Sequence, residues 1–99
     1  MIDLARIVGF EWNAGNARKN KKHGVSQSEA EQVFFDARLL MVADPRPSVD
    51  EARYHALGTT LDRRHLHITF TLRAEGTLIR VVSARDMHRK ERQIYDRED

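Results

Sequence analysis

The chain has 99 residues, of which 40% are hydrophobic and 32% are charged, and its formal net charge is +2. This length suits one small domain, and we expect a single domain over residues 1–99. The absence of cysteine excludes a disulfide framework and a thiolate metal site. No apolar run approaches membrane-spanning length and the first residues do not form a secretory signal, so we expect a cytoplasmic protein with no membrane association.

The N-terminal segment predicts a strand and a first helix. Residues 7–12 have the pattern of a short strand, in which Gly9 suggests a sheet edge. Asn13 can cap a helix over residues 14–23. That helix contains most of the basic excess of the chain. Such a stretch attracts polyanions weakly, but on its own it fits a solvated helix face better.

A second helix has the strongest local signal in the sequence. Ser26 and Glu29 form a capping box, in which each side chain accepts a hydrogen bond from the backbone amide of the other residue. An apolar stripe follows over residues 30–35. The two predicted helices are separated by a very short connection and should form a compact helical corner.

The rest of the chain predicts four strands and a closing helix. The strands cover residues 39–42, 53–58, 65–73 and 78–85, and the helix covers residues 87–95, capped by Asp86 or His88. Two prolines confine residues 44–48 to a loop. Short connections between consecutive strands favour an antiparallel meander. We therefore expect an α+β fold of order β-α-α-β-β-β-β-α, with the helices on one face of the sheet.

The hairpin of residues 65–85 has the clearest pattern. Its first arm alternates apolar and polar residues without a break, which predicts one dry face and one wet face. Its second arm is apolar on both sides and is expected to be a central strand. If Arg73 pairs with Leu78, then Arg80 lies opposite Thr71.

The same register predicts the composition of both faces. Ile68 faces Ser83 on the dry side. The wet side holds His67, Thr69, Thr71, Arg73 and Arg80. Two neighbouring guanidinium groups repel each other, so an anion should lie between them. A carboxylate, from Glu75 or from another element, is the simpler candidate, and a phosphate gripped in a bidentate way is the sharper one.

No motif fixes an active site by spacing alone, because the chain has neither a phosphate-binding glycine loop nor a nucleophile elbow. His65 and His67 share a strand face, but no third ligand accompanies them, and we expect no metal and no cofactor. Metal-free cleavage of RNA needs a base, an acid and cations. Arg53, Arg73 and Arg80 can supply the cations, and His55, His67, Lys22 or Glu91 can transfer protons.

Several short motifs, in their order and spacing, resemble one known family. These are Phe10-Glu11-Trp12, Lys22-His23-Gly24-Val25-Ser26, Val33-Phe34-Phe35-Asp36, Glu51 with Arg53, Gly58, Ile79-Arg80-Val81-Val82-Ser83-Ala84-Arg85, Arg89-Lys90-Glu91-Arg92 and Tyr95. Together they resemble the BrnT-type toxins from about residue 10 to residue 95. The resemblance implies a RelE-like fold and the toxin half of a type II toxin–antitoxin system. Such a toxin is a metal-independent endoribonuclease that inhibits translation by cutting RNA and arrests growth.

The resemblance also implies partners, and it carries over Lys22, His23, Arg53, Arg73, Arg80, Arg85 and Glu91 as matched positions, to which His55, His67, Thr71 and Arg89 are added from the residues themselves. The partner would be a BrnA-type ribbon-helix-helix antitoxin in a 2:2 complex, which contacts operator DNA only through the antitoxin and represses its own operon. Candidate catalytic residues are Arg53, Arg73, Arg80, His55 and Glu91. Candidate RNA-binding residues are Lys22, His23, His67, Thr71, Arg85 and Arg89. Arg85 can instead anchor the last helix, and Glu91 can complete a helix cap or pair with a neighbour.

The chain departs from the family pattern at Leu72, where the family usually has a glutamate. This departure leaves an alternative open. The chain can be a catalytically degenerate, toxin-derived binding module that acts only as antitoxin partner and co-repressor.

Overall fold

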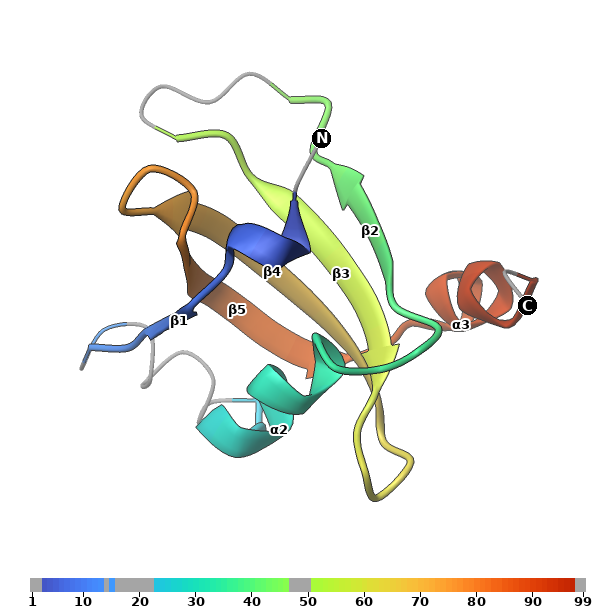
Figure 1. Cartoon of the computed structure of the whole chain (residues 1–99). Coiled ribbons are helices and arrows are strands. Elements are labelled where there is room, and N and C mark those ends of the chain that lie inside the picture. The colour runs from blue at the N-terminus through green and yellow to red at the C-terminus, as the bar shows by residue number, and fades with distance from the viewer. Residues whose placement is uncertain (1–2, 14, 16–22, 47–50, 98–99) are drawn as a thin grey trace.

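The computed structural model describes residues 3–13, 15, 23–46 and 51–97. In these residues a five-stranded sheet combines with two α-helices and a 3-10 turn (Figure 1). The elements are η1 (Leu4–Arg6), β1 (Gly9–Glu11), α2 (Gln27–Val33), β2 (Leu40–Ala43), β3 (Tyr54–Thr59), β4 (His65–Arg73), β5 (Leu78–Asp86) and α3 (Arg89–Arg97). No helix within the described ranges is long and apolar enough to cross a membrane. The α+β class predicted from the sequence is confirmed.

The sheet has the strand order β1-β5-β4-β3-β2. Strands β2 to β5 pair antiparallel in sequence order, which confirms the predicted meander. Strand β1 lies at the edge and pairs parallel with β5, so the sheet is mixed and the expectation of an antiparallel sheet is wrong for this strand. Strand β5 has a neighbour on each side, which agrees with its apolar composition on both faces.

The helix count and helix order differ from the prediction of three helices, two of them N-terminal. Only one N-terminal α-helix, α2, is found among the described residues. The helix expected over residues 14–23 falls almost wholly outside them. Helix α2 begins as predicted, because the Ser26 hydroxyl accepts from the Glu29 amide and the Glu29 carboxylate accepts from the Ser26 amide.

Helix α2 packs its apolar side against one face of the sheet and closes the core. The buried core consists of Val25, Ala30, Val33, Phe34, Ala56, Leu66, Ile68, Phe70, Ile79, Val81 and Ala84. Phe34 of this helical segment meets Phe70 of β4 edge-on, with ring centroids 5.1 Å apart. Burial of this apolar side is what holds so short a helix in place.

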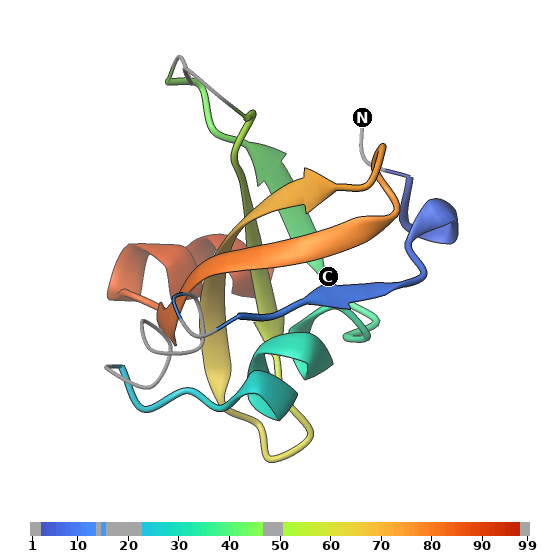
Figure 2. The ribbon, with the colours of Figure 1, turned by 90° about the vertical axis from the view of Figure 1, so that its left-hand side faces the viewer.

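The expectation that both helices cover one face is wrong. Helix α3 contacts His65, His67 and Arg85, whose positions alternate with those of the core residues Leu66, Ile68 and Ala84. It therefore lies on the side of the sheet opposite α2 (Figure 2). Helix α3 buries only a narrow apolar side, because Tyr95 is buried but Ile94 is 49% exposed.

The register of the central hairpin is confirmed for half of its length. Arg73 pairs with Leu78, and Thr71 pairs with Arg80, as predicted. A β-bulge then shifts the register between Thr69 and Phe70, so Ile68 pairs with Ala84 rather than Ser83. The extra residue on β5 restores Ala84 to the core side.

The bulge also decides which arginines share a face. Arg80 and Arg85 are five residues apart, and simple alternation would place them on opposite sides of the sheet. With the bulge, Arg80 pairs with Thr71 and Arg85 pairs with His67, so both lie on the side away from α2. We call this side the polar face. It carries Glu11, His55, His67, Thr69, Thr71, Arg73, Arg80 and Arg85.

The polar face is less wet than the sequence predicts. His67, Thr69 and Thr71 are buried rather than solvated. Helix α3 packs over one end of this face, and longer charged side chains flank the threonines. The alternation of β4 therefore identified a chemical difference between its two sides, but not a difference in solvent exposure.

Candidate active site

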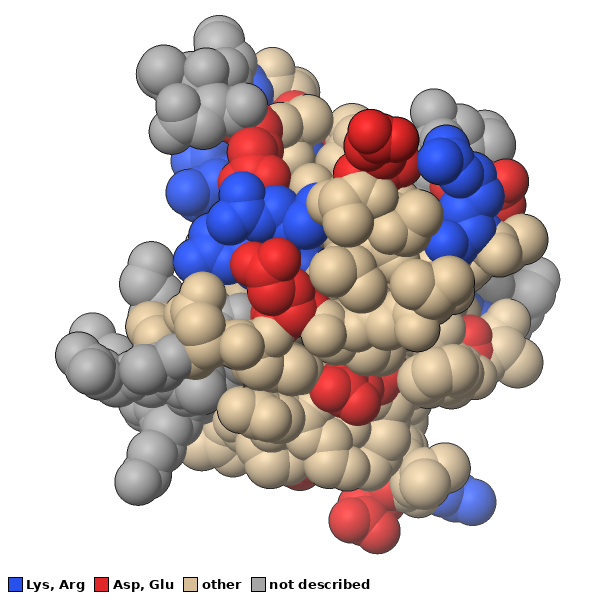
Figure 3. Space-filling model, turned by 60° about the vertical axis from the view of Figure 1, so that its left-hand side comes forward, with Lys and Arg blue, Asp and Glu red and all other residues tan. Residues whose placement is uncertain are grey.

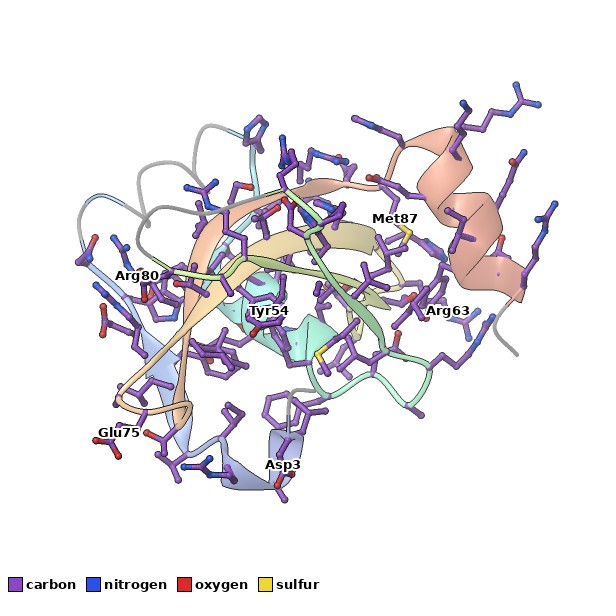
Figure 4. The ribbon with its side chains drawn as sticks, turned by 90° about the horizontal axis from the view of Figure 1, so that it is seen from above. Asp3, Tyr54, Arg63, Glu75, Arg80 and Met87 are labelled. Carbon is purple, nitrogen blue, oxygen red and sulfur yellow. The ribbon has the colours of Figure 1, made fainter. Side chains whose placement is uncertain are left out.

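The polar face carries two groups of charged side chains, one toward each end of β5. In Figure 4 the labelled Arg80 and Met87 mark these two ends, and nitrogen-bearing side chains gather between them on the side of the sheet that carries α3. One group lies at the β1 side near the hairpin turn. The other lies in a cleft beside the start of α3.

The first group consists of Arg73 and Arg80 with two carboxylates. The Glu11 carboxylate lies 3.5 Å from Nε of Arg73 and 3.7 Å from Nε of Arg80. The Glu51 carboxylate lies 3.3 Å from Nη1 of Arg73. Carboxylates from other elements thus separate the two guanidinium groups, which is the simpler of the two arrangements predicted. Figure 3 shows basic side chains in separate clusters with acidic side chains against them.

This first group has unused hydrogen-bonding capacity. Nε of Arg80 and Oγ1 of Thr71 are both buried, and neither has a hydrogen-bond partner among the described residues. Buried polar atoms of this kind are uncommon and are often completed by a ligand or by water. They lie side by side, because Thr71 and Arg80 are cross-strand partners.

The second group lines an open cleft of about 460 Å³. Its lining residues are Val42, Arg46, His55, His67, Thr69, Arg85 and Glu91. They come from β2, the loop after it, β3, β4, β5 and α3. Two arginines and two histidines therefore line the same open cleft.

One wall of the cleft is an ordered chain of hydrogen bonds through His55. Nε2 of His55 lies 3.0 Å from the Asp44 carboxylate, and Nδ1 lies 3.2 Å from the Thr69 hydroxyl. Arg46 binds Asp44 through two side-chain nitrogens, at 2.7 and 3.1 Å, and through its backbone amide. Hydrogen bonds from the Arg46 side chain, from the Arg46 backbone amide and from the His55 ring hold the pKa of Asp44 well below its usual range.

The opposite wall is built on Arg85 and Glu91. The Arg85 guanidinium donates two hydrogen bonds to the Glu91 carboxylate, at 2.8 and 2.9 Å. The Glu91 carboxylate also accepts from the amide of His88, the residue before α3. Burial would raise the pKa of Glu91, but the hydrogen bonds from Arg85 and from the His88 amide lower it to about 2.

His67 lies between the two walls. Its ring stacks at a tilt against His55, with centroids 5.0 Å apart, and its Nε2 is 3.8 Å from the Glu91 carboxylate. Burial and the nearby Arg85 charge lower the pKa of His67 to about 4, although Glu91 opposes this shift. His67 is therefore neutral at pH 7. Its buried Nδ1 has no hydrogen-bond partner among the described residues.

A family model for BrnT, the ribonuclease toxin of type II toxin–antitoxin systems, matches residues 12–91. The chain belongs to the BrnT toxin family. A search of the curated proteins finds no match. The matched range contains every residue of the two charged groups on the polar face except Glu11.

The structure brings together four of the residues that the sequence and the BrnT resemblance single out. His55, His67, Arg85 and Glu91 all line the cleft. The predicted alternatives for two of them are also observed, since Arg85 is bonded to α3 through Glu91, and Glu91 accepts from the amide at the helix start.

The other candidates lie elsewhere. Arg73, Arg80 and Thr71 form the first group, at the far end of the same face. Arg53, Arg89 and His23 are exposed and do not line the cleft. Lys22 lies outside the described residues. Among the residues that the structure describes, no group of three or more histidine, cysteine or acidic side chains is placed to hold a metal ion.

The departure at Leu72 does not alter the polar face. Leu72 packs against the core, and its neighbours Thr71 and Arg73 lie on the other side of β4. A glutamate at position 72 of this chain would point away from both charged groups. Leucine at position 72 therefore leaves the carboxylates of the cleft unaffected.

Sequence reasoning missed Asp44 and Arg46 as parts of the cleft, and it placed Thr69 on the wet side without a role. The segment around Pro45 reads as a plain loop, but its aspartate side chain accepts from the backbone amide two residues later. Such turns are typical of aspartate, so a turn at Asp44 was a usable signal. That the turn would bring Asp44 to His55 follows only from the pairing of β2 with β3.

Proposed function

We propose that this BrnT-family chain is a metal-independent endoribonuclease toxin that cuts RNA on the polar face and thereby inhibits translation. The observation that supports this most is the convergence of arginine and histidine side chains from β3, β4 and β5 on one side of the sheet. Guanidinium groups bind phosphate in a bidentate way, and imidazoles transfer protons near neutral pH.

RNA supplies its own nucleophile, so the protein needs few parts. A base takes the proton of a 2′-hydroxyl, and the 2′-oxygen attacks the adjacent phosphorus. Cations stabilise the charge that grows on the phosphate, and the 5′-oxygen leaves with a proton. The products are a 2′,3′-cyclic phosphate and a 5′-hydroxyl. Arg73, Arg80 and Arg85 are the cations placed on this face.

Arg80 provides the direct test of this proposal. Its side chain is 30% exposed, so a phosphate can reach it, and its buried Nε has no hydrogen-bond partner among the described residues. Arg80→Ala should abolish growth arrest and slow RNA cleavage while the protein stays folded. One lost charge-assisted contact corresponds to about 1.5–3 kcal/mol, or roughly 10- to 150-fold in rate.

The matched control is Arg97→Ala, which removes an exposed arginine at the end of α3, away from both charged groups. It should cleave RNA like the parent protein. Unchanged cleavage by a folded Arg80→Ala protein would contradict the assignment of the polar face.

We further propose the partners that the family implies. A BrnA-type ribbon-helix-helix antitoxin would neutralise the toxin, form a 2:2 complex with it and carry the complex to operator DNA in the cytoplasm. Covering or distorting the polar face would stop RNA from entering. Co-expression of the neighbouring small reading frame should restore growth to cells that are arrested by this chain.

One observation favours a second candidate function. Arg73 and Arg80 are already paired with Glu11 and Glu51, which would have to give way to a phosphate. A toxin-derived module that only binds the antitoxin and co-represses the operon would keep these ion pairs. Induced expression separates the two functions, because only the ribonuclease arrests growth.

A further inference from the structure

The side chain of His55 is held at both ring nitrogens. Asp44 accepts at Nε2 and is itself fixed by three hydrogen bonds from Arg46. The Asp44 side chain is only 4% exposed, whereas that of His55 is 22% exposed and borders the cleft. The histidine edge is therefore accessible, and the group that orients it is shielded.

This arrangement fixes the tautomer of the imidazole. The pKa of Asp44 is held low, so its carboxylate is ionised at neutral pH and can only accept. Nε2 of neutral His55 must then carry the hydrogen, and Nδ1 has the free lone pair. The Thr69 hydroxyl lies 3.2 Å from Nδ1. An alcohol thus already occupies the position from which a proton can move to this nitrogen.

We propose that His55 is the general base of RNA cleavage in this chain, with Asp44 and Arg46 as its positioning residues. This inference rests on the proposed ribonuclease function and assigns the proton transfer within it. The pair of Asp44 and His55 resembles the orienting half of a catalytic triad, in which a buried carboxylate holds an imidazole and stabilises its charged form.

The proposed step transfers one proton to His55 and exchanges one oxygen for another at phosphorus. Nδ1 of His55 takes the proton of the 2′-hydroxyl, which displaces the Thr69 hydroxyl from that nitrogen. The 2′-oxygen forms a bond to phosphorus, and the bond from phosphorus to the 5′-oxygen breaks. Water in the open cleft protonates the leaving 5′-oxygen. Arg85, which also lines the cleft, faces the charge on the phosphate, and Arg80 contacts the RNA backbone further along the same face.

The other proton-transfer candidates in the cleft are less suited to this role. The pKa of His67 is lowered to about 4 by burial and by Arg85, so its lone pair is a weak base. The Glu91 carboxylate is occupied by Arg85 and by the His88 amide, and its pKa is about 2. The charged or titratable groups that face His55 are Asp44, Arg46, His67, Arg85 and Glu91.

The test compares variants on a short single-stranded RNA with a fluorophore at one end. His55→Gln should lower kcat by about 100- to 10,000-fold, the usual contribution of general acid–base catalysis. KM, and the affinity for the same RNA with 2′-O-methyl groups, should stay close to those of the parent. The pH–rate profile of the parent should have an ascending limb that His55→Gln lacks.

Two further variants separate a catalytic role from a structural one. Asp44→Asn keeps a hydrogen-bond acceptor but removes the charge, and it should give a smaller loss of kcat and a displaced ascending limb. His55→Ala should recover part of its activity when imidazole is added to the buffer. The control is Arg97→Gln, because Arg97 is an exposed residue at the end of α3 that does not line the cleft.

Each outcome has a distinct meaning. A parent-like kcat in His55→Gln, with RNA still cleaved, would overturn the assignment of His55 and leave the ribonuclease proposal intact. Failure of imidazole to restore any activity to folded His55→Ala would also count against a general base at this position. A parent protein that cleaves no RNA would overturn both proposals together.

Discussion

At the scale of single residues, Gly58 is a point of close approach between α2 and the sheet. A Cβ atom at this position would lie 2.7 Å from Cγ1 of Val33 and 2.9 Å from its carbonyl oxygen. Gly58→Ala should therefore lower the free energy of unfolding by about 1–3 kcal/mol, because the last turn of α2 must move away. Urea denaturation followed by circular dichroism measures this change.

Gly9→Ala is the matched control for that substitution. The added Cβ would lie 3.6 Å from Cδ2 of Leu78, an ordinary contact, and the residue lies in the edge strand. Its effect should stay within about 0.5 kcal/mol. Equal stability of the two variants would show that α2 and β3 are not in close contact at Gly58.

Two cleft residues should make stability depend on pH in separate windows. His67 has a pKa of about 4 in the folded protein against 6.5 for an isolated histidine side chain, so only the unfolded chain takes up its proton between these values. For Glu91 the corresponding values are about 2 and 4.5. In each window the unfolded state binds more protons, and stability falls as pH falls, by at most about 1.4 kcal/mol per pH unit and group.

Single substitutions show which residue causes the loss of stability in each pH range. His67→Gln should flatten the dependence of unfolding free energy on pH between 6.5 and 4, and Glu91→Gln should flatten it between 4.5 and 2. Urea titrations at half-unit pH intervals measure both slopes. A parent-like slope above pH 4.5 in His67→Gln would mean that His67 is not buried in its neutral form.

The roles of individual residues were predictable where the interacting residues lie close together in the sequence. The capping box at Ser26 and the alternation of β4 needed only local spacing, and both are observed. The burial of Thr71 was not predictable, because it depends on side chains from other elements. The contact between Asp44 and His55 likewise depends on the register between two strands.

At the scale of elements, the bulge in β5 is the feature that assembles the polar face. Without the extra residue, Arg85 would lie on the core side of the sheet and Ala84 would lie on the polar face. The sequence of β5 is apolar on both sides and contains no glycine that would mark the bulge. The bulge is therefore recognised only in the structure, where Ala84 is buried on the core side of the sheet.

The cations that catalysis requires come from the strands themselves, which leads to a prediction about metals. Arg73 and Arg80 at one end, and Arg85 in the cleft, can neutralise a phosphate without a divalent ion. Cleavage of RNA by the purified protein should therefore persist at an unchanged rate in excess EDTA. Loss of activity that a divalent ion restores would instead make His65 and His67 candidate ligands.

At the scale of the whole molecule, the meander was predictable, but the position of β1 and the side covered by α3 were not. Consecutive strands with short turns can pair in few ways, and β2 to β5 pair in the expected order. The placement of β1 beside β5 requires a crossover that no local pattern specifies. The side that α3 covers is set by contacts such as the Tyr95 hydroxyl with Asp36 and Thr59, which join segments far apart in sequence.

The last prediction concerns the oligomeric state of the isolated chain and of its complex with the antitoxin. The described helices are short, at seven and nine residues, and the sequence contains no heptad seam for self-association. The isolated chain should therefore be a monomer or a weak dimer. A ribbon-helix-helix antitoxin dimerises through its own DNA-binding region, so its complex with this chain should contain two copies of each. Light scattering on both samples measures the masses.

A large stable oligomer of the chain alone would refute the first expectation. A one-to-one complex that never doubles at high concentration would refute antitoxin-driven assembly and the operon repression that depends on it.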